Sequence, residues 1–488
     1  FHVLKITFFF FTSFYYYMVF IRPLKISESQ IKPIAQSLLS STSQIMNGIF
    51  PIEKPVNKTS QQVLSSLNNI LLEKSERLRT QLETEKEQFI KDFKATNKGK
   101  APTGKAIRRF SKLKMGQGGT LDPMASGLLI IGLNNGTKNL QKYLTNSTKS
   151  YTFKAILGQE TMSGDNQEDF KSTLSVNSYE HLLNMSKEEK NGLEEKIKKA
   201  FIGKPLNQVP PVYSALKING RRLYDYIRNG EEIPGEIEPR VVELLDIEFH
   251  EDNFKVIPQT PLTEEPTELY EKEEENEEEE KENKENNKDG DNKKNKKMKK
   301  QKFDGNKNLQ RLGPNGSLPV TDELLNQVMK YKNQIKTYTI DTNETGGILQ
   351  TDEELNKITD IKDPFYEKMK YRQVPLVELN MTIKVSSGFY VRSVVRDICK
   401  ILNTSGYMTS LTRVAQKQWD MKNGCYFKLE DFENEANEPI WYDLLAKVME
   451  DEEKGALVDV RSVLDKVDKK RKLEENKEEE EANKKIKI

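Results

Sequence analysis

The chain has 488 residues, of which 31% are charged and 35% hydrophobic, and its 77 Lys and Arg against 76 Asp and Glu leave a net charge of +1. That length allows two or three domains, yet the apolar fraction is too low for one compact body, so we expect part of the chain to be unfolded. Because the balanced total conceals segregated charge, it does not exclude a polyanionic partner.

The few cysteines and histidines exclude several kinds of site. The two cysteines lie far apart in sequence, which supports neither a disulfide framework nor a zinc pair, so a reducing compartment is expected. The histidines lie outside every motif described below, which argues against a Ser-His-Asp triad or a His-rich metal site. These residues are Cys399, Cys425, His2, His181 and His250. We therefore expect no metal.

Residues 1–21 are apolar and aromatic over nearly the length of a membrane span, and Arg22 and Lys25 follow them. A membrane anchor is not favoured, because Met46 resembles a natural start that leads directly into a patterned strand. We expect residues 1–45 to be a leader or targeting extension outside the fold.

From Gly48 the sequence predicts a short apolar strand, a turn at Lys54-Pro55 and a helix capped by Thr59-Ser60. A charged helical segment is expected over residues 73–92.

A basic run follows, since no acidic residue occurs from Phe93 to Leu121. Such a run is often only a solvated face. Here it leads directly into the most informative motif of the chain, so we expect it to contact the phosphates of RNA. Its cations are Lys94, Lys98, Lys100, Lys105, Arg108, Arg109, Lys112 and Lys114, of which Lys112 and Lys114 lie nearest the motif.

That motif is Gly118-Gly119-Thr120-Leu121-Asp122-Pro123-Met124-Ala125-Ser126-Gly127-Leu128-Leu129. Paired glycines let the backbone turn sharply and approach a ligand, and Asp-Pro favours a turn. The pattern predicts a tight loop that directs the Asp122 carboxylate into a cleft.

The motif resembles the signature of TruB-type pseudouridine synthases, which isomerise a uridine in the TΨC arm of tRNA. The resemblance implies that Asp122 is the catalytic residue. Lys54-Pro55 is similar to the family's opening motif, and we include Lys54 among the expected RNA contacts. One departure is Gln117, which stands where many relatives have a histidine that helps to open the T-loop. A glutamine can still bond a base edge.

Residues 149–158 alternate like a half-buried strand, and Tyr151 matches a family tyrosine that lies against the target base. The turn at residues 161–165 is also family-like, and we assign it to architecture. Two further family-like blocks span residues 208–230 and 385–398. From the first we expect Lys217 to touch phosphate, although solvated surface is nearly as good an interpretation.

The second block supplies Tyr390 as an expected substrate contact and Arg392 as the partner of Asp122. A guanidinium beside a carboxylate in a water-excluding cleft lowers the pKa of that carboxylate and fixes its orientation. A purely structural Asp–Arg pair is the alternative.

The resemblance implies an α+β pseudouridine synthase fold, a mixed and mainly antiparallel sheet with peripheral helices. The family-like blocks divide the catalytic domain into residues 46–258 and 364–433. Between them, residues 259–363 include a Glu, Lys and Asn run that cannot form a core, so a mostly disordered charged insertion is expected. Residues 434–488 should hold a terminal helix and a charged disordered tail.

The implied reaction converts uridine 55 in the TΨC loop to pseudouridine and needs no cofactor, since nothing is oxidised and no group enters from outside. Asp122 would act on the sugar, Tyr151 would hold the base and Arg392 would keep Asp122 ionised. Whether Asp122 adds to C1′ or removes a proton at C2′ stays open.

Too little patterned sequence follows residue 433 for a PUA domain, which favours the stand-alone eukaryotic branch. A guide-RNA-dependent rRNA synthase and a non-catalytic tRNA-binding chaperone are the alternatives. The expected partner is the TΨC arm of tRNA, with no membrane and no obligate protein partner, and the protein should be a monomer. The basic cluster Lys469-Lys470-Arg471-Lys472 and the extension suggest nucleus and mitochondrion.

Overall fold

The computed structural model describes most of the chain from residue 46 onward. By its internal contacts the chain divides into a unit Phe1–Met46 and a unit Asn47–Ile488, and the elements below belong to the second. The expected leader, residues 262–364 of the expected insertion and the tail beyond residue 469 lie outside the described residues. Those described are 46–161, 163–166, 173–211, 213–229, 231, 233–235, 237–261, 365, 368–369, 372–434 and 437–469.

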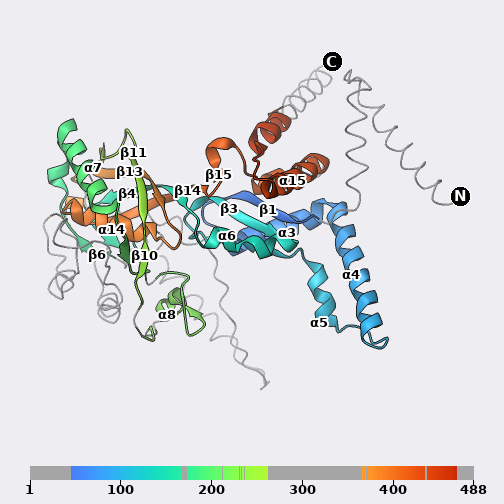
Figure 1. Cartoon of the computed structure of the whole chain (residues 1–488). Helices are drawn as coiled ribbons and strands as arrows, with labels where there is room; N and C mark the ends of the chain where they lie inside the picture. Colours follow the sequence, from blue (N-terminus) through green and yellow to red (C-terminus); the bar gives the residue numbers. More distant parts are fainter. Residues whose placement is uncertain are drawn as a thin grey trace, which may run out of the picture. The chain divides into compact units, whose positions relative to one another are not determined.

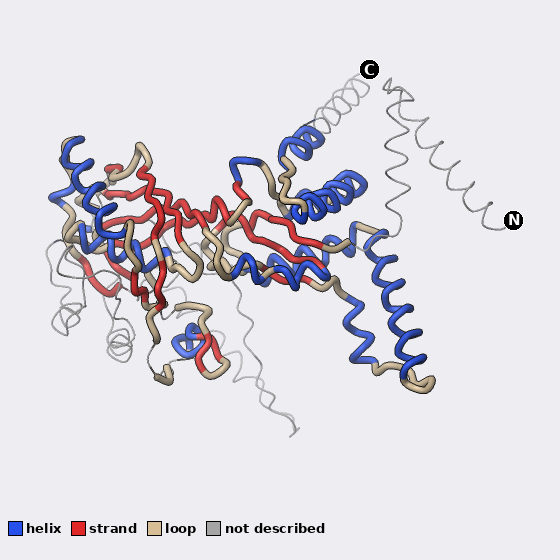
Figure 2. Tube along the Cα trace, viewed as in Figure 1, coloured by secondary structure: helices blue, strands red, loops and turns tan. Residues whose placement is uncertain are grey.

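Within the described part of the chain, nine strands form one sheet (Figures 1 and 2). Its central path runs in the order β1, β3, β14, β4, β13, β11, and every pairing on this path is antiparallel except the parallel pair β3 and β14. This mixed, mainly antiparallel sheet with helices around it confirms the expected α+β fold. The bounds are β1 Gly48–Lys54, β3 Ser126–Leu133, β14 Gly406–Gln416, β4 Lys149–Leu157, β13 Leu376–Val385 and β11 Leu244–Phe249.

Strands from both sides of the expected insertion share this sheet. β4 precedes residues 259–363 in sequence, and it lies between β13 and β14, which both follow them. The side chains of Thr152 and Thr382 hydrogen-bond across β4 and β13, with 2.7 Å between their Oγ1 atoms. The two sequence blocks therefore form one folded body.

The remaining strands are short. β2 (Met115–Gln117), β12 (Lys255–Ile257) and β15 (Trp419–Asp420) pair with β3, β13 and β14 respectively. Separate two-stranded pairs are β5 (Gln159–Thr161) with β6 (Thr173–Val176), β7 (Leu206–Gln208) with β10 (Arg240–Val242), and β8 (Lys217–Ile218) with β9 (Arg221–Arg222).

Among the described residues, no helix is both long and apolar enough to cross a membrane. The α-helices are α3 Ser60–Lys74, α4 Glu76–Thr96, α5 Gly104–Ile107, α6 Gln141–Leu144, α7 Lys187–Phe201, α8 Leu223–Arg228, α14 Val391–Ile401, α15 Glu438–Glu453 and a last one over residues 460–469. Short 3-10 helices are η1 Arg108–Ser111, η2 Asn134–Asn139, η4 Glu180–Leu182, η5 Met421–Asn423 and η6 Leu429–Phe432.

Helix α3 shows why the sequence after β1 folds as predicted. The Thr59 hydroxyl accepts a hydrogen bond from the amide of Gln62, and the Gln62 side chain accepts one from the amide of Thr59. This capping box satisfies two amides that have no partner within the helix. Val63 and Leu67 are fully buried, so the expected strand, turn and helix are confirmed.

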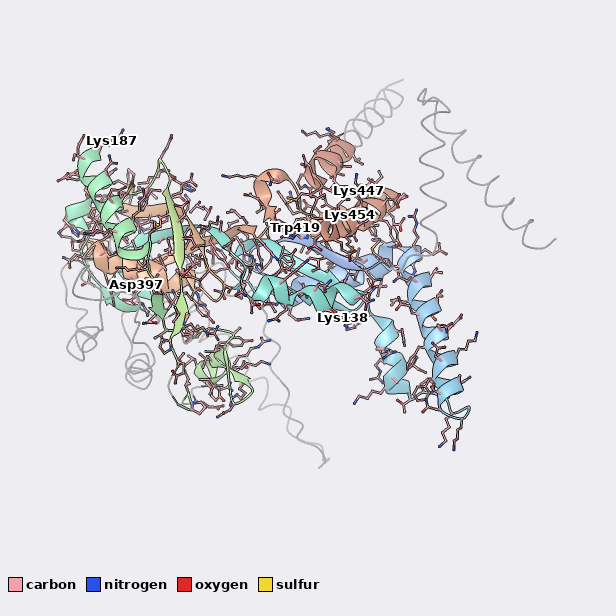
Figure 3. All side chains as sticks on the ribbon, in the orientation of Figure 1. Lys138, Lys187, Asp397, Trp419, Lys447 and Lys454 are labelled. Atoms are coloured by element: carbon pink, nitrogen blue, oxygen red, sulfur yellow. The ribbon has the colours of Figure 1, made fainter. Side chains whose placement is uncertain are left out.

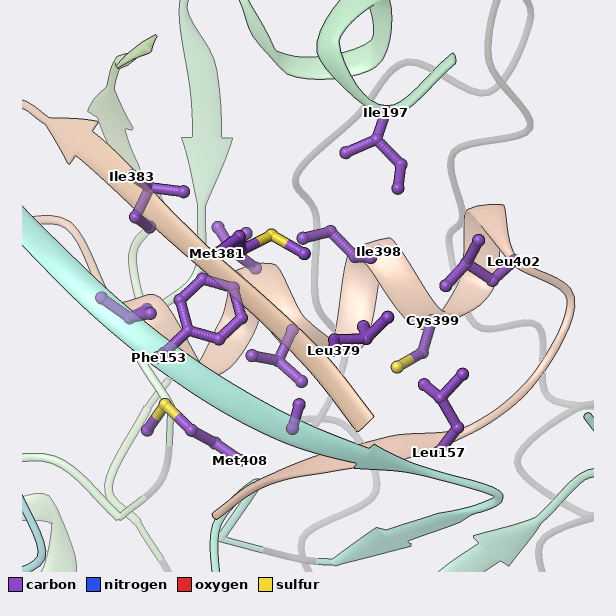
Figure 4. Close-up of a cluster of buried hydrophobic side chains, with 14 of the residues drawn as sticks. Phe153, Leu157, Ile197, Leu379, Met381, Ile383, Ile398, Cys399, Leu402 and Met408 are labelled. Carbon is purple, nitrogen blue, oxygen red and sulfur yellow. The ribbon is translucent and has the colours of Figure 1, made fainter. Parts of the chain in front are cut away.

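Helix α14 is fixed to the sheet by an apolar core (Figure 4). Ile398 and Cys399 of α14 pack near Phe153 of β4 and Leu379 and Met381 of β13, and each of the five is at most 1% exposed. Burying a side chain of this size contributes roughly 2 kcal/mol. Val394 and Val395 belong to the same core, which therefore also fixes the beginning of α14, where Arg392 lies.

One glycine permits the parallel contact between β3 and β14. Gly127 pairs with Arg413, and its φ of +98° is rarely adopted by residues with a side chain. A methyl group on Gly127 would lie 2.8 Å from the Arg413 backbone nitrogen. The junction between β3 and β14 therefore requires glycine.

We expect Gly127→Ala to lower the free energy of unfolding by roughly 3 kcal/mol, because it adds steric overlap and backbone strain. Chemical denaturation measures this difference. The matched control is Gly104→Ala, since a methyl group there would meet nothing within 4 Å. The control should change stability by less than about 1 kcal/mol. Equal stability of the two variants would contradict the role of Gly127.

Candidate active site

The Asp122 loop, residues 118–125, joins β2 to β3, and other elements hold its backbone. The Gly118 amide donates to the Ile130 carbonyl at 2.8 Å. The Ser60 hydroxyl, at the start of α3, accepts from the Leu121 amide at 3.0 Å and donates to the Leu121 carbonyl at 3.2 Å. Within the loop, the Ala125 amide donates to the Asp122 carbonyl at 3.1 Å. Asp122 thus stands on a fixed turn.

The Asp122 carboxylate pairs with the guanidinium of Arg392 in the first turn of α14. The distance from Arg392 Nε to Asp122 Oδ2 is 3.1 Å. The Arg392 side chain is only 6% exposed, whereas that of Asp122 is 37% exposed. A carboxylate that is open to solvent on one side and paired with a buried cation on the other can meet a substrate while staying oriented.

Arg392 also bonds three other groups, which fix its guanidinium. Its Nη1 lies 3.4 Å from Asp165 Oδ2 and donates to the Ser163 carbonyl at 2.8 Å. Its Nη2 donates to the Tyr213 carbonyl at 2.7 Å. Asp165 is itself held, since its Oδ1 accepts from the Ser163 hydroxyl at 2.8 Å. One buried guanidinium therefore links two carboxylates from separate loops.

The sequence analysis missed this role of Asp165. The turn at residues 161–165 was assigned to architecture, and the structure places its aspartate in the site, 6% exposed and bonded to Arg392. The available signal was the family-like turn itself, which contains an acidic residue.

Tyr151 lies on β4 directly opposite Arg413 of β14, a residue that the sequence analysis also missed. Arg413 is fully buried, and its guanidinium interacts electrostatically with the Tyr151 side chain. The same guanidinium donates to the carbonyls of Leu128 at 2.6 Å and Gly119 at 3.2 Å. Burial lowers the pKa of Arg413, and Tyr151 counteracts this. Arg413 therefore ties Tyr151 to the Asp122 loop.

Lys54 supports the Asp122 loop in the structure, and its expected role as an RNA contact stays a prediction. Its side chain is fully buried, and its ammonium donates to the carbonyls of Pro55 at 2.9 Å, Pro123 at 3.0 Å and Ala125. Burial lowers the pKa of Lys54 to about 7, while the charge of Asp122 opposes that change. The Lys54 side chain therefore exposes no surface, and its three donors are taken by carbonyls beside the loop.

Gln117 and Tyr390 each precede one member of the ion pair in sequence, Gln117 before Asp122 and Tyr390 before Arg392. The Gln117 amide donates to the Thr120 hydroxyl at 3.0 Å, within the turn that leads to Asp122. The backbone of Tyr390 is held by Gln208, which accepts from its amide at 2.6 Å and donates to its carbonyl at 3.0 Å. Gln208 thereby fixes the chain two residues before Arg392.

The remaining predicted contacts are on the surface. Lys112 and Lys114 are exposed on the segment that enters β2, and Lys217 is exposed on β8. The structure therefore brings Asp122 and Arg392 into contact and ties Tyr151 to the same loop. The three lysines remain outside that cluster. In the described ranges, no group of three or more His, Cys, Asp or Glu side chains could hold a metal ion.

The chain is similar to known pseudouridine synthases over most of its length. A model of the TruB family pseudouridylate synthase N-terminal domain matches residues 107–259, which include Asp122 and Tyr151. The tRNA pseudouridine synthase 4 of Saccharomyces cerevisiae is 33% identical over 435 residues, covering 87% of this chain and 89% of the yeast protein. The enzyme of the same name from Schizosaccharomyces pombe is 28% identical over 410 residues, covering 84% and 87%.

A bacterial relative and a solved structure align with this chain over a smaller share of their own length. The tRNA pseudouridine synthase B of Bacteroides fragilis is 35% identical over 149 residues, covering 30% of this chain and 58% of that protein. A crystal structure of a Cbf5-Nop10-Gar1 complex aligns with a TM-score of 0.34 at 13% identity, covering 82% of this chain and 59% of that one. The identity to the budding-yeast enzyme extends over nearly all of both proteins. This chain therefore belongs to the TruB family of pseudouridine synthases.

Proposed function

We propose that this protein is a tRNA pseudouridine synthase, an isomerase that converts uridine 55 in the TΨC loop of tRNA to pseudouridine. The observation that carries the proposal is the contact of 3.1 Å between Asp122 and the buried Arg392 in a chain of this family. Two relatives that align over most of this chain are named tRNA pseudouridine synthases, which supports tRNA as the substrate.

The reaction needs one ionised carboxylate at the sugar. It breaks the bond between C1′ and N1 of uridine, turns the detached uracil and joins C1′ to C5, with no net oxidation and no group gained. Asp122 either adds to C1′ or removes a proton at C2′, and both routes require its charge. The guanidinium of Arg392, 3.1 Å away, holds the carboxylate in one orientation for that role.

Positioning of Asp122 depends on groups that do not touch the substrate. Asp165 and the carbonyls of Ser163 and Tyr213 keep Arg392 in one orientation, and Lys54 binds carbonyls on the far side of Asp122. Tyr151 is held by Arg413, which suits a side chain that must keep a detached base in place. Errors of about 1 Å in such arrangements cost large factors in rate.

RNA binding is best supported by the basic segment between α4 and β2. Arg109 lies over the ring of Phe89, 4.1 Å from its centre, which fixes η1 against α4. Residues 97–114 contain no acidic side chain, and all of their cations are exposed. These cations precede the Asp122 loop directly, where a phosphate backbone must be held. They are Lys98, Lys100, Lys105, Arg108, Arg109, Lys112 and Lys114.

We also propose that the enzyme works as a monomer, without an obligate protein partner, in the nucleus and the mitochondrion. The support for the locations is the basic cluster at residues 469–472 and the extension at residues 1–45. Light scattering of the purified protein and imaging of a tagged full chain test these points.

Asp122→Asn should abolish pseudouridine formation in unmodified tRNA, by at least about a thousandfold in rate, because the amide can neither add to C1′ nor accept a proton. Binding of tRNA should stay within a few fold of wild type. Mapping of pseudouridine in tRNA, with a transcript carrying cytidine at position 55 as the control, measures the rate and the position. A wild-type protein that binds tRNA without forming pseudouridine would instead indicate a chaperone.

Asp165→Asn should lower kcat by roughly a hundredfold, because Arg392 would lose one of its two anions and shift against Asp122. KM for tRNA should change less than about threefold, since Asp165 is 6% exposed and does not face the RNA. Asp246→Asn on β11, where the carboxylate is exposed, is the matched control and should leave both constants unchanged. A rise in KM alone would show that Asp165 serves binding instead.

Replacing Lys98, Lys100 and Lys105 by Gln should weaken tRNA binding and reduce its dependence on salt. The slope of log K against log salt concentration should fall by about two to three, because each lost phosphate contact removes nearly one released counterion. The control replaces Lys187, Lys196 and Lys199, which are exposed on α7 (Figure 3 labels Lys187). If both variants lose the same slope, the basic segment has no special part in binding.

A further inference from the structure

Four buried cations surround the Asp122 loop, and three of them have well-defined acceptors. Lys54 bonds three carbonyls, and Arg392 bonds carboxylates and carbonyls. Arg413 bonds two carbonyls and interacts electrostatically with the Tyr151 side chain. Lys149 is the fourth, and its side chain differs from the others in what it contacts.

Lys149 begins β4 and lies on the same face as Tyr151, two residues further along the strand. On the neighbouring strand β14, Gln416 pairs with Lys149 and Arg413 pairs with Tyr151. These four side chains share the face that carries the Asp122 loop. The Lys149 Cε atom lies 3.8 Å from where a methyl group on Gly119 would stand. Lys149 is therefore beside the loop, close to the glycine that precedes Asp122 by three positions.

The Lys149 ammonium has unused donors. Among the described residues its one hydrogen-bond acceptor is the Ser147 hydroxyl, at 3.0 Å, and it forms no ion pair there. The residue is 8% exposed, and the charged group that acts on it is another cation, Arg413. Burial and Arg413 lower the pKa of Lys149 to about 8, so the group remains mostly charged at pH 7. An ammonium carries three N–H donors, and two of these lack an acceptor.

A buried cation without a counterion is costly, unless a bound ligand supplies the missing anion. Lys154 on the opposite face of the same strand is 38% exposed, and even there its ammonium pairs with Glu378 at 2.7 Å. Beside Lys149 the positive charge of Arg413 favours an anion over a neutral carbonyl. RNA supplies that anion as phosphate, and removing a uridine from its stack brings the flanking backbone toward the protein.

We propose that Lys149 binds a phosphate oxygen of the RNA next to the target uridine. The proposal rests on the proposed function, because it takes RNA as the substrate. In the complex the phosphate completes the coordination of the ammonium, and the nucleotide is fixed on the face that also carries Tyr151. Lys149 is thus a substrate-positioning residue that leaves the chemistry to Asp122.

The first test measures binding of unmodified tRNA at several salt concentrations for Lys149→Met, Lys149→Arg and the control Lys154→Met. Lys149→Met should bind roughly tenfold more weakly and reduce the salt slope by about one. Lys149→Arg should retain the slope, and Lys154→Met should match wild type. A merely structural lysine would leave the slope of Lys149→Met unchanged, and that result would overturn the proposal.

The second test changes the RNA instead of the protein. Wild-type protein is titrated with T-arm hairpins in which each phosphate flanking the target uridine is replaced singly by an uncharged methylphosphonate. One replacement should weaken wild-type binding about tenfold and have no further effect on Lys149→Met. No loss at either linkage, or losses that add fully to that of the variant, would overturn the proposal. Pseudouridine formation by wild type on the unmodified hairpin separately tests the proposed function.

Discussion

The site depends on one buried guanidinium. Arg392 is 6% exposed, and burying its charge is tolerable because Asp122 and Asp165 face it from two loops while two carbonyls take its remaining donors. The arrangement serves both sides of the pair. Arg392 needs the carboxylates in order to be buried, and Asp122 needs a fixed cation in order to stay oriented at a partly open position. Neither group could be moved independently of the other.

Buried side chains that donate hydrogen bonds to its backbone carbonyls fix the conformation of the Asp122 loop. Gly118 and Gly119 have no side chains, which leaves their carbonyls open to Gln416 at 2.7 Å and Arg413 at 3.2 Å, both from β14. Lys54 at the end of β1 reaches the carbonyls that follow Asp122. Because a buried carbonyl without a donor is unfavourable, these bonds select one loop conformation. The central position of β14, a strand from the second sequence block, is therefore a requirement of the site.

The local sequence was sufficient to predict individual turns, strands and caps, but not the contacts between residues that are distant in the chain. The turn at Asp122 follows from its own glycines and proline, and the alternation of β4 and the cap of α3 are equally local. The function of Asp165 and Arg413 depends on partners that are distant in the chain. Arg413 bonds a carbonyl 294 positions away, and Arg392 bonds one 229 positions away. The burial of Lys54 could not be predicted for the same reason, since a lysine beside a turn is normally exposed and only the folded loop encloses it.

The charges around the loop also distinguish two kinds of RNA contact. Even without Lys54, whose pKa of about 7 leaves it partly neutral, the cations Lys149, Arg392 and Arg413 outnumber the carboxylates Asp122 and Asp165, so the site is positive before substrate arrives. In the proposed complex, exposed cations such as those before β2 act on the RNA at long range and are screened by salt. A buried cation acts only over a few ångströms but through a lower dielectric, so its contact is stronger and depends on exact placement. On this proposal the exposed cations bring RNA to the site, and buried Lys149 selects the nucleotide that is held opposite Asp122.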